Sequence, residues 1–186
     1  MKNILNKVLV TVLLTCLLFV VFIANAWMLP SAKAATARAP KVSAAAVGGK
    51  VIDVDLTQQS LTAFENGRAV FSTLILTGRA GLDTPTGTYQ VFSKASPTTF
   101  YSPWPVGSPN YYPPTTVSYA LEWKPGGFFL HDSWWHTVYG PGTNSIHSDP
   151  VYGPQNGSHG CISMPYASAR WLYTWAPIGT PVRIHM

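Results

Sequence analysis

The sequence predicts a mostly β domain, arranged like a sandwich or a barrel, that ends in one helix and a closing strand. The chain has 186 residues, of which 16 are proline and 15 are glycine, so many turns and short elements are expected. From residue 50 onward, candidate strands recur at a spacing of about 8–12 residues, which is typical of sandwiches and barrels. The apolar content of 47% and the charged content of 10% exclude a disordered chain.

Four strands are expected in the first half of this domain. In the first of them, apolar Ile52 and Val54 are separated by polar Asp53, which is the pattern of a half-buried strand. The dipeptide Asn66-Gly67 indicates a hairpin turn, because both residues tolerate the positive φ that tight hairpins need. The expected strands are residues 51–56, 61–64, 69–76 and 88–92.

The second half contains two long irregular stretches, residues 95–116 and 133–157. The first holds six prolines, and a loop of this length in a compact domain usually has a function. One helix is expected from Pro165 to Ala176, because Ala167, Trp171 and Trp175 share a face at a spacing of four. The remaining expected strands are residues 117–123, 128–130 and 181–184.

Residues 1–34 are expected to form a hydrophobic helix that serves as a signal peptide or as a membrane anchor. Lys2 and Lys7 precede an uncharged and largely apolar stretch that extends to Ala32. The small residues around Lys33 favour cleavage, whereas the length of the apolar stretch favours a retained span. Both alternatives place the remainder outside the cytoplasm, at the outer face of the cytoplasmic membrane or in the cell wall. Residues 35–48 are expected to be a linker and residues 49–186 the folded domain.

The distribution of charge excludes one class of partner. The formal net charge is +5, but Lys2, Lys7 and Lys33 supply most of the excess. The chain has no run or stripe of basic residues, so nucleic-acid binding is not expected. Contact with a membrane is expected only through the N-terminal segment, and the domain is expected to be a monomer.

Cys161 is the main candidate for a catalytic residue. It is the only cysteine outside the N-terminal apolar segment, and an unpaired thiol is an oxidation liability in an exported protein. A thiol with a pKa of about 8.5 is mostly protonated at neutral pH, so it needs a base or a cation beside it. The preceding Gly160 lets the backbone turn so that nearby N–H groups can face a developing oxyanion.

Four histidines lie within 31 residues of Cys161, namely His131, His136, His147 and His159. We favour His131 as the general base, because it ends an apolar strand and a strand end is a rigid position. His147 is the alternative base. For His159, two residues before the cysteine, a structural or substrate-orienting role is expected, because a base so close in sequence has restricted geometry.

The segment Ser158-His159-Gly160-Cys161-Ile162, with a histidine upstream, resembles the active-site signature of the L,D-transpeptidases, which have a YkuD-like catalytic domain. Four other segments are similar to that family and occur in the same order, so the resemblance covers nearly all of residues 49–186. They are the opening hairpin from Val51, the turn Thr84-Pro85-Thr86-Gly87-Thr88-Tyr89, the run Phe129-Leu130-His131-Asp132, and the closing helix and strand around Trp171 and Gly179.

The resemblance implies a mostly β L,D-transpeptidase catalytic domain that acts on peptidoglycan stem peptides. In this family a cysteine forms an acyl-enzyme on a tetrapeptide stem, the terminal D-alanine leaves, and the acyl group passes to an amine during cell-wall cross-linking or remodelling. By position, Cys161 is the nucleophile and His131 the base, oriented by the backbone carbonyl of Asp132. The backbone around Gly160 forms the oxyanion hole. No cofactor and no metal are implied.

Further residues are expected to contact the substrate. Ser158 and His159 line the pocket by their position in the motif, and Asp132 follows the base. Trp134 lies in a loop where its indole can stack on sugar or on the stem peptide.

Two departures from the family pattern concern the site directly. Ser163 stands where the family usually has asparagine or arginine. The spacing between His131 and Cys161 is longer than usual, and the additional segment, residues 139–149, contains His147. This insertion is expected to lie beside the cleft.

Three other functions remain open on the residues. An L,D-carboxypeptidase would use the same thiol with water as acceptor, and a non-catalytic cell-wall binding module would use the loop aromatics alone. A zinc hydrolase would use Cys161, His159 and either His147 or His131 as ligands. The chain has no His-Glu-x-x-His or Cys-x-x-Cys motif to support zinc.

Overall fold

The computed structural model describes residues 49–186. The hydrophobic helix expected in residues 1–34 and the linker expected in residues 35–48 lie outside the described residues, so both stay predictions. Within the described part of the chain, no helix combines the length and the apolar character needed to span a membrane.

A five-stranded sheet joins the two ends of the domain. Its strand order is β3-β2-β1-β13-β4. The first strand, β1 (Lys50–Asp55), pairs in antiparallel fashion with β2 and in parallel fashion with the last strand, β13 (Pro181–His185). The other strands are β2 (Ser60–Glu65), β3 (Arg68–Leu74) and β4 (Gly87–Gln90). The side chains of Ile52 and Val54 are fully buried, which confirms the predicted alternation.

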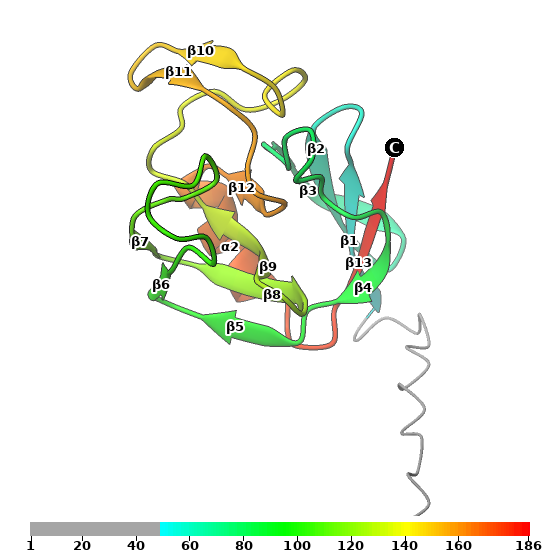
Figure 1. The fold of residues 1–186 in the computed structure, drawn as a ribbon. Coiled ribbons are helices and arrows are strands. Elements are labelled where there is room, and N and C mark those ends of the chain that lie inside the picture. The colour runs from blue at the N-terminus through cyan, green and yellow to red at the C-terminus, as the bar shows by residue number, and fades with distance from the viewer. Residues whose placement is uncertain (1–48) are drawn as a thin grey trace, which may run out of the picture. The chain divides into compact units, whose positions relative to one another are not determined.

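A four-stranded sheet, with the order β12-β9-β8-β5, carries the candidate site. Its strands are β5 (Ser93–Ala95), β8 (Ala120–Lys124), β9 (Phe128–Asp132) and β12 (Ile162–Met164). Strands β9 and β12 are parallel neighbours. Parallel neighbours need a long crossover connection, and the long segment between them supplies it. The crossover holds the pair β10 (His147–Asp149) and β11 (Gly153–Gln155), which lies apart from the two larger sheets in Figure 1.

The apolar core is shared by the two larger sheets and the helix α2 (Tyr166–Trp175). Ile52 of β1, Leu121 of β8 and Leu172 of α2 belong to one cluster and are fully buried. A further small pair, β6 (Thr98–Phe100) with β7 (Thr115–Val117), lies next to the four-stranded sheet (Figure 1), where Phe100 stacks on Phe129 of β9 at 4.8 Å. The predicted fold, mostly β with one helix near the C-terminus, is confirmed.

The buried face of the helix differs from the expected one. Ser168, Ala169 and Leu172 are its buried residues, whereas Ala167 is exposed. Trp171 and Trp175 do share a face, with their rings stacked 5.3 Å apart, but both are only half-buried. The helix packs against β8 and β9 with Ser168, Ala169 and Leu172, whereas the indole of Trp171 stacks on the ring of Phe71 in β3 at 4.2 Å.

The sequence did not predict five of the short strands, namely β5, β6, β7, β10 and β11, nor the strand after the cysteine, β12. Each has only three residues, too few to show alternation. In β12 all three residues are buried, so no polar position marks the exposed side of a strand.

Candidate active site

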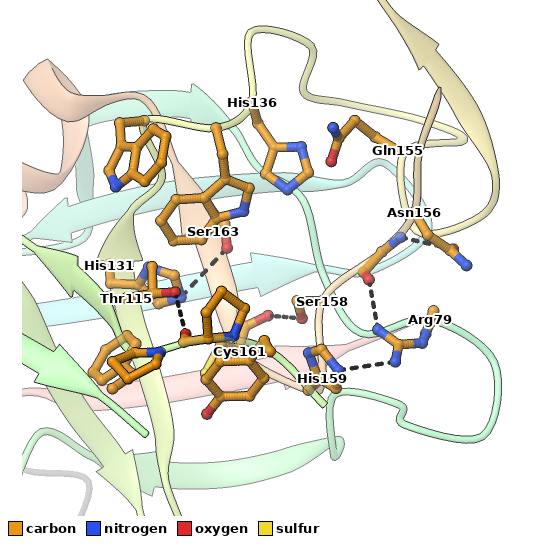
Figure 2. Close-up of a pocket in the computed structure, with 17 residues that line it drawn as sticks. Arg79, Thr115, His131, His136, Gln155, Asn156, Ser158, His159, Cys161 and Ser163 are labelled. Carbon is orange, nitrogen blue, oxygen red and sulfur yellow. Dashed lines mark hydrogen bonds between the residues drawn. The ribbon is translucent and has the colours of Figure 1, made fainter. Parts of the chain in front are cut away.

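Neighbouring strands bring the cysteine and the predicted base to one face of a sheet. In the register of β9 with β12, Ser163 pairs with His131. Side chains alternate between the two faces of a strand, so Cys161, two residues before Ser163, faces the same side as His131. All three line one cleft of about 580 Å³, and Figure 2 shows Cys161 between His131 on one side and Arg79 on the other.

The thiol of Cys161 is half-buried and donates a hydrogen bond to the carbonyl oxygen of Gly127 at 3.3 Å. The pKa of Cys161 is raised to about 11, mainly because burial removes the thiol from water. A hydrogen bond from the backbone of Phe129 lowers this pKa in part, and the negative charge of Glu122 raises it further. The resting group is therefore a neutral thiol, and a base must take its proton as it reacts.

His131 is positioned as such a base. Its ring is buried, and Nδ1 lies 2.8 Å from the carbonyl oxygen of Asp132. A carbonyl only accepts, so Nδ1 carries the proton and Nε2 keeps its lone pair. Burial lowers the pKa of His131, although the bond to Asp132 acts in the opposite direction. The imidazole is therefore neutral near pH 7, and its Nε2 accepts a long hydrogen bond from the Ser163 hydroxyl at 3.4 Å.

His159 is occupied differently. Its Nε2 lies 2.9 Å from Nη2 of Arg79, and a guanidinium only donates, so Nε2 is the acceptor. The ring also lies 5.2 Å from the ring of Trp104 and 5.1 Å from that of Tyr112. Burial lowers the pKa of His159, and the charge of Arg79 lowers it further. With its lone pair engaged, His159 is unsuited to be the base and instead fixes the cysteine loop.

The loop before Cys161 is stabilised by its own side chains. Ser158 donates its hydroxyl proton to the carbonyl oxygen of Cys161 at 2.6 Å and accepts the N–H of Gly160 at 3.0 Å. The carbonyl oxygen of Gly160 accepts from the hydroxyl of Thr84 at 3.0 Å. Gly160 has a φ of +108°, and a Cβ there would lie 2.7 Å from Cε1 of Phe128, so this position needs glycine.

This arrangement changes the expected oxyanion hole. The N–H of Gly160 points at Ser158 and is not free, contrary to the role expected for it from sequence. The N–H of Cys161 has no hydrogen-bond partner among residues 49–186, so it is the backbone donor available beside the sulfur.

Asp132 does not contact the cleft as expected. Its carboxylate is 3% exposed and accepts the backbone N–H groups of Ser118 and Tyr119, at 2.9 and 2.7 Å. The carboxylate thus holds β9 against the start of β8, and only the carbonyl of Asp132 serves the site. Trp134, by contrast, lines the cleft, is 62% exposed, and has its indole fixed by a hydrogen bond to the carbonyl of Thr116.

The insertion places its histidine behind the cleft wall. His147 bonds through Nδ1 to the carbonyl of Ser145 at 2.8 Å and does not line the cleft, so it is a poor candidate for the base. His136 does line the cleft, and the centre of its ring lies 6.3 Å from that of His147. The pKa of His136 is lowered to about 4, mainly because the ring is buried and secondly because His147 lies nearby. This cleft residue is therefore neutral. Gln155 and Asn156 extend the same neutral wall in Figure 2.

Arg79 is the functional candidate that sequence reasoning missed. It follows β3 in the glycine-flanked run from Thr77 to Gly81, where an isolated charged residue in a turn was the only signal. Its guanidinium reaches the carbonyl of Gly157 at 3.3 Å, the side chain of Asn110 at 3.0 Å, and His159. Within the described residues, no three His, Cys, Asp or Glu side chains are placed to share a metal ion.

The thiol of Cys161, just before β12, and the neutral imidazole of His131, near the end of β9, thus line one cleft. The family model of the L,D-transpeptidase catalytic domain matches residues 49–184. The chain therefore belongs to the L,D-transpeptidase family.

Individual relatives agree with this assignment. Probable L,D-transpeptidase 3 of Mycobacterium tuberculosis is 33% identical over 108 residues, which cover 56% of this chain and 35% of the relative. L,D-transpeptidase 2 of the same species is 30% identical over 142 residues, covering 74% of this chain and 32% of the relative. A solved structure of L,D-transpeptidase 3 from M. tuberculosis, in complex with a faropenem-derived adduct, has a TM-score of 0.59 and 26% identity, covering 74% of this chain and 60% of that one. The chain thus spans about a third of the length of these curated relatives.

Proposed function

We propose that this protein is an exported peptidoglycan L,D-transpeptidase that forms a cysteine acyl-enzyme on a tetrapeptide stem and transfers the acyl group to an amine. The observation that carries the proposal is the pairing of β9 with β12, which directs Cys161 and His131 into one cleft. The tautomer of His131, with Nε2 as the acceptor and only the long contact of the Ser163 hydroxyl at 3.4 Å to displace, matches the need of a neutral thiol for a base.

In the acylation step, Nε2 of His131 accepts the thiol proton as the sulfur attacks the carbonyl carbon of the third stem residue, in the peptide bond to the terminal D-alanine. The backbone N–H of Cys161 donates to the oxyanion that develops on the carbonyl oxygen. As the intermediate collapses, the protonated His131 gives its proton to the nitrogen of the departing D-alanine. The product is a thioester on Cys161, and the carbonyl of Asp132 has held the imidazole in place throughout.

In the transfer step, the amine of a second stem attacks the thioester carbonyl. His131 accepts a proton from this amine, the carbon–sulfur bond breaks, and the proton returns to the sulfur. A new amide bond forms and the free thiol is restored. Water in place of the amine would give an L,D-carboxypeptidase with the same residues.

The remaining parts of the proposal concern location and substrate contacts. The N-terminal segment would export the domain, by cleavage or as an anchor, to the outer face of the cytoplasmic membrane or to the cell wall. Ser158 and His159 would shape the cleft next to the sulfur, and the exposed indole of Trp134 would contact the substrate at the cleft rim. The domain would act as a monomer and without a metal or cofactor.

The purified protein with a synthetic tetrapeptide stem and a second stem that bears a free amine tests this function. Mass spectrometry should detect a cross-linked product that has lost one D-alanine, and Cys161→Ala should yield none while folding normally. Release of D-alanine without cross-linking would favour the carboxypeptidase. Binding of the stem with no turnover by the wild type would favour the non-catalytic wall-binding module.

A further inference from the structure

One unpaired positive charge lies in the wall of the active-site cleft. Among the described residues that line the cleft, Arg79 is the one whose side chain carries a permanent charge, and none is an aspartate or a glutamate. Figure 2 shows the guanidinium beside His159 and Ser158, on the side of Cys161 opposite to His131. The cleft therefore has a positive end and an otherwise neutral lining.

The hydrogen bonds of Arg79 leave its charge uncompensated. Its three partners are the carbonyl of Gly157, the amide oxygen of Asn110 and Nε2 of His159, and all three are uncharged. The ion pairs within residues 49–186 are Lys50–Glu65 and His185–Asp53, and neither involves Arg79. A guanidinium has five N–H donors, so two of them remain for a ligand.

A half-buried cation without a counter-ion is costly for the folded protein alone, because it has lost part of its hydration. Consistent with this, partial burial lowers the pKa of Arg79 from its usual range. The remaining donors are Nε–H and one N–H of Nη1, which point to different sides of the guanidinium, so an anionic ligand group would restore the lost interaction through one charge-assisted hydrogen bond.

We propose that Arg79 binds a carboxylate of the donor stem peptide and so orients the stem across Cys161. This inference rests on the proposed function and adds the chemical group that the cleft recognises. Two carboxylates have this chemistry, the one at the C-terminus of the departing D-alanine and the one on the side chain of a diamino-dicarboxylic third residue. Recognition of the first would select tetrapeptide stems with a free terminus, and recognition of the second would select the type of third residue.

Three synthetic donors separate these sources. One keeps only the C-terminal carboxylate, the second keeps only the carboxylate on the third side chain, and the third has every carboxyl group amidated. Wild-type protein should process one carboxylate donor with a kcat/KM about 10–100-fold above the amidated donor, as expected for a hydrogen bond to a charged group. In Arg79→Gln, the kcat/KM of that carboxylate donor should exceed that of the amidated donor by no more than about threefold.

Matched variants distinguish binding from mere support of the loop. Asn110→Ala removes a neutral partner of Arg79 and should leave the ratio between donors unchanged, as should Arg170→Gln, which removes an exposed charge on α2. If Arg79→Gln is inactive with every donor, Arg79→Lys is the variant to measure, because it keeps the positive charge. It should retain a preference for the carboxylate donor over the amidated donor, and this preference should weaken as salt is added.

Two results would overturn the proposal. One is a wild-type protein that processes all three donors equally, and the other is a carboxylate preference that survives in Arg79→Gln. If the wild type processes none of the donors, the proposed function itself fails, which is a different outcome.

Discussion

Replacing Gly160 by alanine probes the conformation that the cysteine loop requires. At a φ of +108° any residue other than glycine is strained, by about 1–3 kcal/mol. The added Cβ would also lie 2.7 Å from Cε1 of Phe128, whose ring packs edge-on against Trp123 at 5.6 Å and would have to move. Such overpacking costs about 1–3 kcal/mol more, for a total of roughly 2–6 kcal/mol. A domain of this kind has a free energy of unfolding of about 5–15 kcal/mol, so the variant should fold but unfold at a lower urea concentration than the wild type.

Gly107→Ala is the matched control. Gly107 has a φ of +92°, yet a Cβ there meets no atom within 4 Å, so this variant carries the backbone strain without the clash. Urea unfolding followed by circular dichroism should show Gly160→Ala losing at least about 1 kcal/mol more than Gly107→Ala. Equal losses for the two variants would refute the reasoning that Phe128 confines the loop.

Three further predictions concern the chemistry. His131→Ala should slow acylation by roughly 10²–10⁴-fold, whereas His147→Ala should change it less than about threefold, and the reverse order in stopped-flow assays would disprove the choice of base. The value of kcat/KM should rise with pH as His131 loses its proton, at a pKa below its usual 6.5. Above that range kcat/KM should stay level, because the pKa of Cys161 is raised to about 11. An inflection of the profile near pH 8.5 would contradict a neutral thiol. Ser163→Ala should slow acylation less than about tenfold, since its hydroxyl lies 3.4 Å from Nε2 of His131, and a larger loss would give Ser163 a direct part in the reaction.

The fold was predictable where a short pattern decides a local structure. The alternation of Ile52 and Val54 with polar neighbours predicted β1, and Asn66-Gly67 predicted the turn between β2 and β3. Asn66 and Gly67 indeed have φ values of +51° and +77°. Strand β12 was not predictable, because its three residues are buried through contacts with distant segments.

The site was predictable to a similar extent. The motif around Cys161 and the strand that ends in His131 indicated a thiol and an imidazole, but not the register that places them on one face. The contact between Arg79 and His159 joins residues 80 positions apart, so no local pattern announces it. The expected substrate contact of Asp132 was wrong because two backbone N–H groups of the neighbouring strand region already occupy its carboxylate.

Peptide mapping after incubation with the synthetic tetrapeptide stem and an acid quench tests the central claim most directly, because it locates the bond that the sulfur forms. The account predicts one covalent adduct per chain, on the tryptic peptide that contains Cys161, with slower formation in His131→Ala and none in Cys161→Ala. An unmodified thiol in folded wild-type protein, or an adduct that forms equally fast without His131, would contradict it.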